Sequence, residues 1–252
     1  MTYIMNRNWA LEVSKGNVAG HSSVLVRGHN PSQTAASGFV DIAEMGDLTY
    51  LTSAETMEIA SSSADDTSAG AGLRTVLVQG VDGTGAAISE VVSMNGTSDV
   101  QTSNSYLRVN SMVGLTAGST GWNVGSVTAT ATTAATIQDE MDMTESISQG
   151  SHYTVPLGNT LYVIQADFNA AKISGGSAPE IEFKGYARSG GDGAAWIQLF
   201  DKKLDTGVSD EIVVLIPNPA AAIARTDIRL RANTDTNSTE VRSRLHGILV
   251  AD

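Results

Sequence analysis

Apolar and polar residues alternate over short segments along most of the chain, a pattern typical of β-strands. The clearest example lies in the stretch 61–98. An apolar segment at 73–81 is followed by a turn at 82–85 (Asp-Gly-Thr-Gly) and by a second apolar segment at 88–94. Period-two spacing bounded by Gly, Asp and Asn predicts an antiparallel hairpin.

The same alternation continues in at least five segments of the second half, where Ile181 and Phe183 alternate with Glu182 and Lys184. We predict that the inward-facing positions form one core made of Ile181, Phe183, Ile228, Leu230 and Leu245. Short strands separated by turns are typical of sandwiches and jelly rolls. The expected fold is all-β, with β-sandwich or jelly-roll modules joined by Gly-rich loops.

Three regions are predicted from these segments. Residues 1–52 form an N-terminal arm with short strands and a loop at 28–38, residues 53–150 a first β-sandwich module, and residues 151–252 a second, jelly-roll-like module. The Thr- and Ala-rich segment 127–137 is expected to be one flat strand. The acidic segment 138–150 is expected to be a linker or a short helical turn.

Composition narrows the function. The 252-residue chain has a net charge of -12, and residues 1–150, with 15 acidic and 5 basic residues, supply -10 of it. This acidity argues against binding nucleic acid or an anionic membrane. The sequence has no cysteine, no apolar run near the roughly 20 residues that span a bilayer, and no signal peptide pattern at its N-terminus.

Candidate catalytic and metal-binding motifs are absent from the sequence. The four histidines show no metal-ligand spacing, and the sequence GHSSV at 20–24 lacks the last Gly of a nucleophile elbow. The acidic residues of 138–150 do not match an EF-hand loop and are expected to form a solvated face. We therefore predict that the protein is not an enzyme and needs no cofactor or metal.

The order SADDTSAGAGLRTVLVQGVDGTGAAISEVVSMNGTSDV at 63–100, with later segments at 153–159, 225–228 and 247–250, resembles a family of tailed-bacteriophage virion structural proteins common in marine phages. The resemblance covers roughly residues 53–250. It implies a noncatalytic virion component, a capsid decoration or cement protein or a head-fibre knob. Such a protein is made in the host cytoplasm and resides in the virion. Its expected partners are further copies of itself, with a homotrimer favoured, and the major capsid protein or other virion proteins.

A second function class stays open, that of a receptor- or glycan-binding module of a tail fibre. Loop aromatics would carry it by stacking on sugar faces, and the candidates are Trp122, Tyr186 and Trp196.

Two candidate interfaces follow from the sequence. Trp9 and Leu11 are predicted to anchor the N-terminal arm to the particle, because apolar side chains near a chain end bury much area per ordered residue. A basic ladder that meets an acidic surface, or a solvated sheet face, is predicted where two strands carry outward arginines. These arginines are Arg229, Arg231, Arg242 and Arg244.

Overall fold

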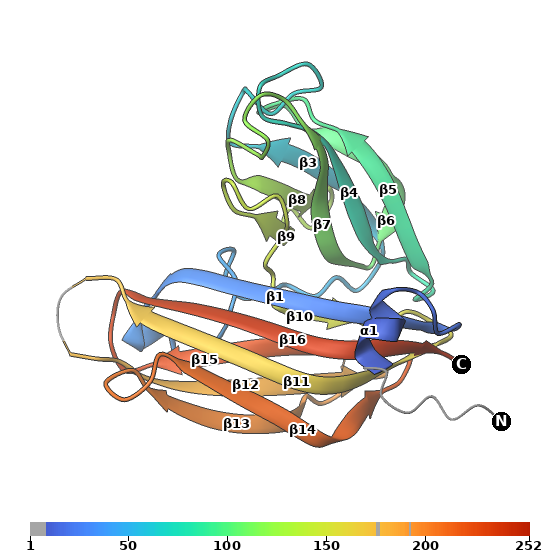
Figure 1. Cartoon of the computed structure of the whole chain (residues 1–252). Helices are drawn as coiled ribbons and strands as arrows, with labels where there is room; N and C mark the ends of the chain where they lie inside the picture. Colours follow the sequence, from blue (N-terminus) through green and yellow to red (C-terminus); the bar gives the residue numbers. More distant parts are fainter. Residues whose placement is uncertain (1–8, 175–176, 192) are drawn as a thin grey trace.

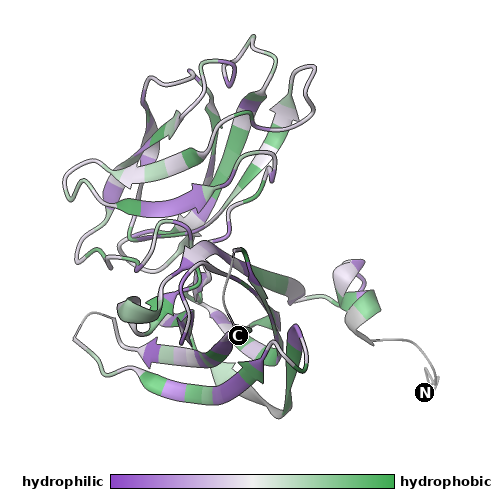
Figure 2. Cartoon of the chain, turned by 90° about the vertical axis from the view of Figure 1, so that its left-hand side faces the viewer, coloured by the Kyte–Doolittle hydropathy of each residue, from purple (hydrophilic) through white to green (hydrophobic). Residues whose placement is uncertain are grey.

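The computed structural model describes residues 9–174, 177–191 and 193–252, with all their side chains except those of residues 9, 10 and 217–220. The described chain is nearly all β-structure, arranged as two lobes that each contain two antiparallel sheets (Figure 1). This confirms the predicted fold class. Figure 2 shows green and purple residues alternating along the strands of both lobes, as expected for sheets with one buried face.

The first lobe pairs a four-stranded sheet with a three-stranded one. The four-stranded sheet has the order β6 (Val100–Tyr106), β3 (Glu55–Ser61), β8 (Val127–Ala131) and β9 (Ile137–Met141). The three-stranded sheet has the order β5 (Ala87–Ser93), β4 (Leu73–Val81) and β7 (Arg108–Ala117). The predicted hairpin is confirmed, because β4 and β5 pair from Thr75↔Ser93 to Val81↔Ala87. In its turn, Asp82 Oδ1 accepts hydrogen bonds from the backbone of Thr84 and Ala86.

A buried carboxylate holds the loops of the first lobe in place. Asp66, which is fully buried, accepts hydrogen bonds from Ser61 Oγ at 2.6 Å and from the Leu73 amide at 2.7 Å. It also accepts from the amides of Val124 and Gly125, each at 2.9 Å. The polar run before β4 is therefore tied to a loop almost 60 residues further along the chain.

The second lobe is a sandwich of two larger sheets. One has the order β1 (His21–Gln33), β16 (Thr239–Ala251), β11 (Asn159–Lys172) and β14 (Glu211–Ala222). The other has the order β10 (His152–Thr154), β15 (Thr226–Thr234), β12 (Glu180–Ser189) and β13 (Ile197–Asp205), and β2 (Val40–Asp41) also pairs with β15. All five predicted core residues are buried between these sheets, which confirms that prediction.

The N-terminal region, predicted as an arm with short strands and a loop at 28–38, contributes strands to the second lobe. The 13-residue strand β1 pairs with β16 from His21↔Val250 to Gln33↔Thr239, and it includes much of the segment expected to be a loop. Gly28 permits this close packing, since a Cβ there would lie 2.4 Å from Ser243 Oγ and 2.5 Å from Ile42 O. The short helix α1 (Trp9–Ser14) precedes β1, and the 3-10 turn Ala35–Ser37 follows β1. The first 52 residues therefore supply two strands, β1 and β2, to the second lobe.

The segment 127–141 also differs from the expectation of one strand followed by an acidic linker. It forms two strands, β8 and β9, because the chain turns back at residues 132–136. The amides of Thr133 and Ala134 in this turn donate to Glu55 Oε2. Gln138 and Asp139 are buried in β9, so the start of the acidic segment belongs to the lobe interior. Among the residues that the structure describes, none of the helices has the length and apolar character to cross a membrane.

Candidate functional site

The two lobes meet at a buried charge cluster. Arg108, from β7 of the first lobe, reaches Asp227 of β15 in the second lobe, with Nε 3.3 Å from Oδ1. Arg188 of β12 binds the other oxygen, with Nη2 2.6 Å from Oδ2. Thr154 Oγ1 adds a third hydrogen bond at 2.7 Å, and all four side chains are buried. A carboxylate shared by two guanidinium groups therefore joins the lobes.

Aromatic rings alternate with arginines beside this cluster. The guanidinium groups of Arg108 and Arg188 both contact the ring of Tyr50, at 4.7 and 4.5 Å from its centroid. Trp196 lies between Arg188 at 4.7 Å and Arg229 at 4.1 Å. Such cation–π contacts strengthen when they are shielded from water. Burial, the largest cause, and the nearby Asp41 and Asp227 carboxylates raise the pKa of the Tyr50 hydroxyl, so this ring stays neutral.

These contacts bear on the predicted sugar-stacking aromatics. Trp196 is engaged by two arginines, and Arg229 also lies over Tyr186 at 5.7 Å. Trp122, in a loop of the first lobe, keeps 49% of its surface exposed. Of the three candidates, only Trp122 presents a largely uncovered ring.

The predicted arginine ladder is wrong, because β15 and β16 lie in different sheets of the second lobe. Arg231 of β15 binds Asp41 and Asp47, with closest distances of 3.1 and 2.6 Å, and Arg229 Nη1 lies 3.9 Å from Asp41 Oδ1. These two arginines hold the loop after β2 onto the sheet. On β16, Arg242 Nε binds Glu240 at 2.7 Å, while Arg244 faces a pocket described below. The alternation of residues within each strand can be predicted from the sequence, but which strands are neighbours cannot.

The predicted N-terminal anchor lies in and before α1. Residues 1–8 fall outside the described part of the chain, as does the side chain of Trp9. Leu11 is 49% exposed, whereas Val13 is buried. Leu11 is therefore accessible for contact with another molecule, as an anchor requires.

Two buried titratable side chains, His152 and Asp139, are neighbours at the junction of the lobes. His152 of β10 is buried, and both of its ring nitrogens face backbone carbonyl oxygens, Nδ1 at 2.9 Å from Gly150 and Nε2 at 2.7 Å from Val109. Carbonyl oxygens only accept hydrogen bonds, so a ring nitrogen that makes either of these bonds is its donor. The buried carboxyl of Asp139 is the neighbouring acid. Burial raises its pKa to about 6, against the opposing effect of His152.

Because the pKa of Asp139 is above its ordinary value of 3.8, we expect this group to make the folded state less stable as pH rises from about 4 through 6. Asp139→Asn removes the titrating group. Between pH 4 and pH 7, the free energy of unfolding is expected to fall by about 1–3 kcal/mol less in this variant than in the wild type. Urea unfolding of both proteins across this range measures the difference, and parallel pH curves would contradict it.

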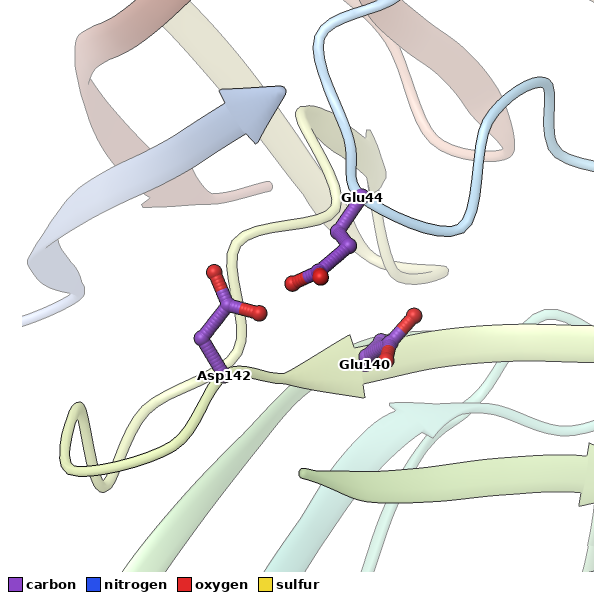
Figure 3. A group of neighbouring side chains, drawn as sticks. All are labelled: Glu44, Glu140 and Asp142. Atoms are coloured by element: carbon purple, nitrogen blue, oxygen red, sulfur yellow. The ribbon is translucent and has the colours of Figure 1, made fainter. Parts of the chain in front are cut away.

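Three carboxylates gather where the first lobe's chain passes to the second. Oxygen atoms of Glu44, Glu140 and Asp142 lie within 4.8 Å of one another, and Figure 3 shows the three side chains as neighbours. Asp142 Oδ2 is 2.8 Å from His29 Nδ1, and Nε2 of the same ring is 3.2 Å from Glu240 Oε1. Burial, followed by the nearby charge of Asp139, raises the pKa of Glu140.

This oxygen set is of the kind that hard cations such as Ca²⁺ accept. The expectation of a fully solvated acidic face is wrong here, since Asp139 is buried and Glu140 and Asp142 are half-buried. The cluster could not be predicted from the sequence, because Glu44 is almost 100 residues away from the other two.

Comparisons with known proteins are sparse. No family model matches the chain, and no curated protein matches it. Among solved structures, the chain shows a weak likeness to "Structure of infectious bursal disease virus Gt strain", with a TM-score of 0.24 and 9% identity over 92% of this chain and 73% of that one. For "Structure of infectious bursal disease virus Gx strain" the TM-score is 0.20, with 10% identity over 92% of this chain and 71% of that one. Scores of this size carry no argument about function.

Proposed function

We propose that the protein is a noncatalytic structural component of a tailed-phage virion, a capsid decoration or cement protein or a head-fibre knob. The resemblance of residues 53–250 to phage virion proteins supports this assignment. The observation that carries it is the buried Arg108–Asp227–Arg188 cluster, which fixes one lobe against the other. Two lobes held in one arrangement by a buried ion-pair cluster suit a virion component that must keep its shape in the particle. It would be made in the host cytoplasm and retained in the virion.

Attachment to the particle tests this function. We expect the purified protein to co-sediment with empty capsids of the phage that encodes it. Deleting residues 1–20 is expected to abolish co-sedimentation but to leave a β-type circular dichroism spectrum, because the first strand begins at His21. A truncated protein that still binds would place the anchor elsewhere.

A glycan array used beside the capsid experiment distinguishes the tail-fibre alternative from the structural role. The structural role would be overturned if the full-length protein did not co-sediment with capsids but bound glycans, and if Trp122→Ala abolished that glycan binding. Trp122 is the matched choice for this variant because its ring is exposed.

We propose that the protein acts as symmetric copies, with a trimer favoured. The strands β13 and β14 are the outermost members of their sheets, and they carry large exposed apolar side chains. Ile197 is 66% exposed, Leu215 68% and Val213 49%. Edge strands with uncovered apolar side chains are natural places for a second copy to pack.

Light scattering at micromolar concentration is expected to give three times the 26.2 kDa chain mass. Leu215→Lys is expected to yield monomers, since it places a charge in the proposed contact. Val91→Lys, at a 55% exposed position of the first lobe, is the matched control and should leave the mass unchanged. A wild-type monomer would contradict the proposal.

A further inference from the structure

A pocket of about 340 Å³ lies on the outer face of the β1–β16–β11–β14 sheet, beside the connection between the lobes. Its lining comes from four strands and from this connection, and its charged residues are Arg27, Arg242, Arg244, Asp167, Glu211 and Glu145. The arginines face outward because they alternate with core residues such as Val26 and Leu245. A pocket of this size accepts a small molecule.

Two arginines in this pocket lie directly opposite each other. Arg27 of β1 is the register partner of Arg244 of β16, and like charges opposite each other in a sheet are destabilising. Within the described part of the chain, neither side chain has an ion-pair or hydrogen-bond partner. Arg27 Nε is also shielded from solvent without an acceptor. A donor of this kind costs free energy unless an acceptor reaches it.

The acidic neighbours do not neutralise this pair. Asp167 of β11 is the register partner of Arg244, but its carboxylate binds other side chains. Its Oδ1 accepts from Gln165 Nε2 at 2.5 Å, and its Oδ2 lies 3.1 Å from His246 Nε2. Glu240 is directed to Arg242 and His29. Two guanidinium groups therefore face one pocket, and among the described residues none of the carboxylates that line it forms an ion pair with either of them.

We propose that Arg27 and Arg244 bind the oxyanion, a carboxylate or a phosphate monoester, of a small ligand. Planar guanidinium groups match the two oxygens of such a group. Glu145 and Glu211, both exposed at the rim, repel polyanions. The same carboxylates accept hydrogen bonds from hydroxyl or ammonium groups. The ligand class is thus a small molecule with one oxyanion beside hydrogen-bond donors, such as an acidic sugar or an amino acid.

Titration of the full chain tests this site. The probes are sodium glucuronate, sodium glutamate and inorganic phosphate, with glucose as the neutral control, all at constant ionic strength. The readout is the ¹⁵N–¹H signal of each arginine Nε. We expect glucuronate or glutamate to shift the Arg27 and Arg244 signals saturably and more strongly than phosphate, and glucose to leave them unchanged.

Matched variants complete the test. Arg27→Gln and Arg244→Gln are each expected to weaken affinity about tenfold or more, the loss of one charged contact. Arg74 lies in the first lobe and donates to Gly70 O. Arg74→Gln should therefore change the affinity of the pocket for these probes less than about twofold. Absence of a saturable shift with any oxyanion, or binding by both pocket variants that is as tight as that of the wild type, overturns the site. Phosphate binding as tightly as the other two probes overturns the role given to the rim carboxylates.

Discussion

Replacing Asp227 with alanine is expected to lower the free energy of unfolding by about 3–5 kcal/mol. The carboxylate lies between Arg108 and Arg188, and these three residues are respectively 3%, 2% and 7% exposed. Removal of the carboxylate takes away the acceptor that two buried guanidinium groups share. Taking one partner out of a buried ion pair costs far more than the pair contributes, because the remaining charge cannot regain its water.

The same substitution is expected to change the cooperativity of unfolding. Arg108 belongs to the first lobe and Asp227 to the second, so their pair couples the two. Urea unfolding followed by far-ultraviolet circular dichroism should show one transition for the wild type and a broadened or double transition for Asp227→Ala. Asp201→Ala is the control, since its carboxylate is 39% exposed and 3.6 Å from Lys184. It should cost less than about 1 kcal/mol. Equal losses in both variants would contradict the coupling.

The parts of the fold that sequence predicts well are those set by local spacing. The β4–β5 hairpin follows from period-two apolar positions around a turn whose Asp82 side chain bonds the backbone two and four residues on. The core positions of β12 and β15 follow from the same period. In each case, neighbours along the chain contain all the information that the prediction uses.

Local spacing fails where the period is interrupted. In β9 the adjacent residues Gln138 and Asp139 are both buried, and the pairing with β8 shifts register between Ala129 and Thr130. Two consecutive buried polar residues do not look like a strand in the sequence. The segment therefore resembles an acidic linker when it is considered alone.

The junction could not be predicted because its residues come from distant parts of the chain. Arg108 and Asp227 are 119 residues apart, and His29 and Asp142 are 113 apart. The pairing of β1 with β16 joins the two ends of the chain. Nothing in the spacing of charges along one strand identifies its neighbour, so the sequence does not show that the arginines of β15 and β16 lie in different sheets.

Phe183→Ala is expected to cost about 3–5 kcal/mol, as truncation of a core aromatic does. Phe183 is fully buried in β12, with its ring stacked on that of Phe168 at a centroid distance of 4.5 Å and an angle of 22°. The two rings belong to opposite sheets of the second lobe. Truncation leaves a cavity between the sheets that both of them line, so neither sheet alone can close it.

The next residue tests whether burial causes this loss. Lys184 points to the other face of β12, where Nζ lies 2.8 Å from Glu182 Oε1 and 4.2 Å from the ring of Phe39. Lys184→Ala removes these partly solvated contacts and is expected to cost under about 1 kcal/mol. Urea unfolding of the two variants compares positions that differ only in the direction of the side chain from the sheet. A loss for Lys184→Ala as large as that for Phe183→Ala would mean that contacts on the outer face, with Phe39 and Glu182, stabilise this lobe as much as its core.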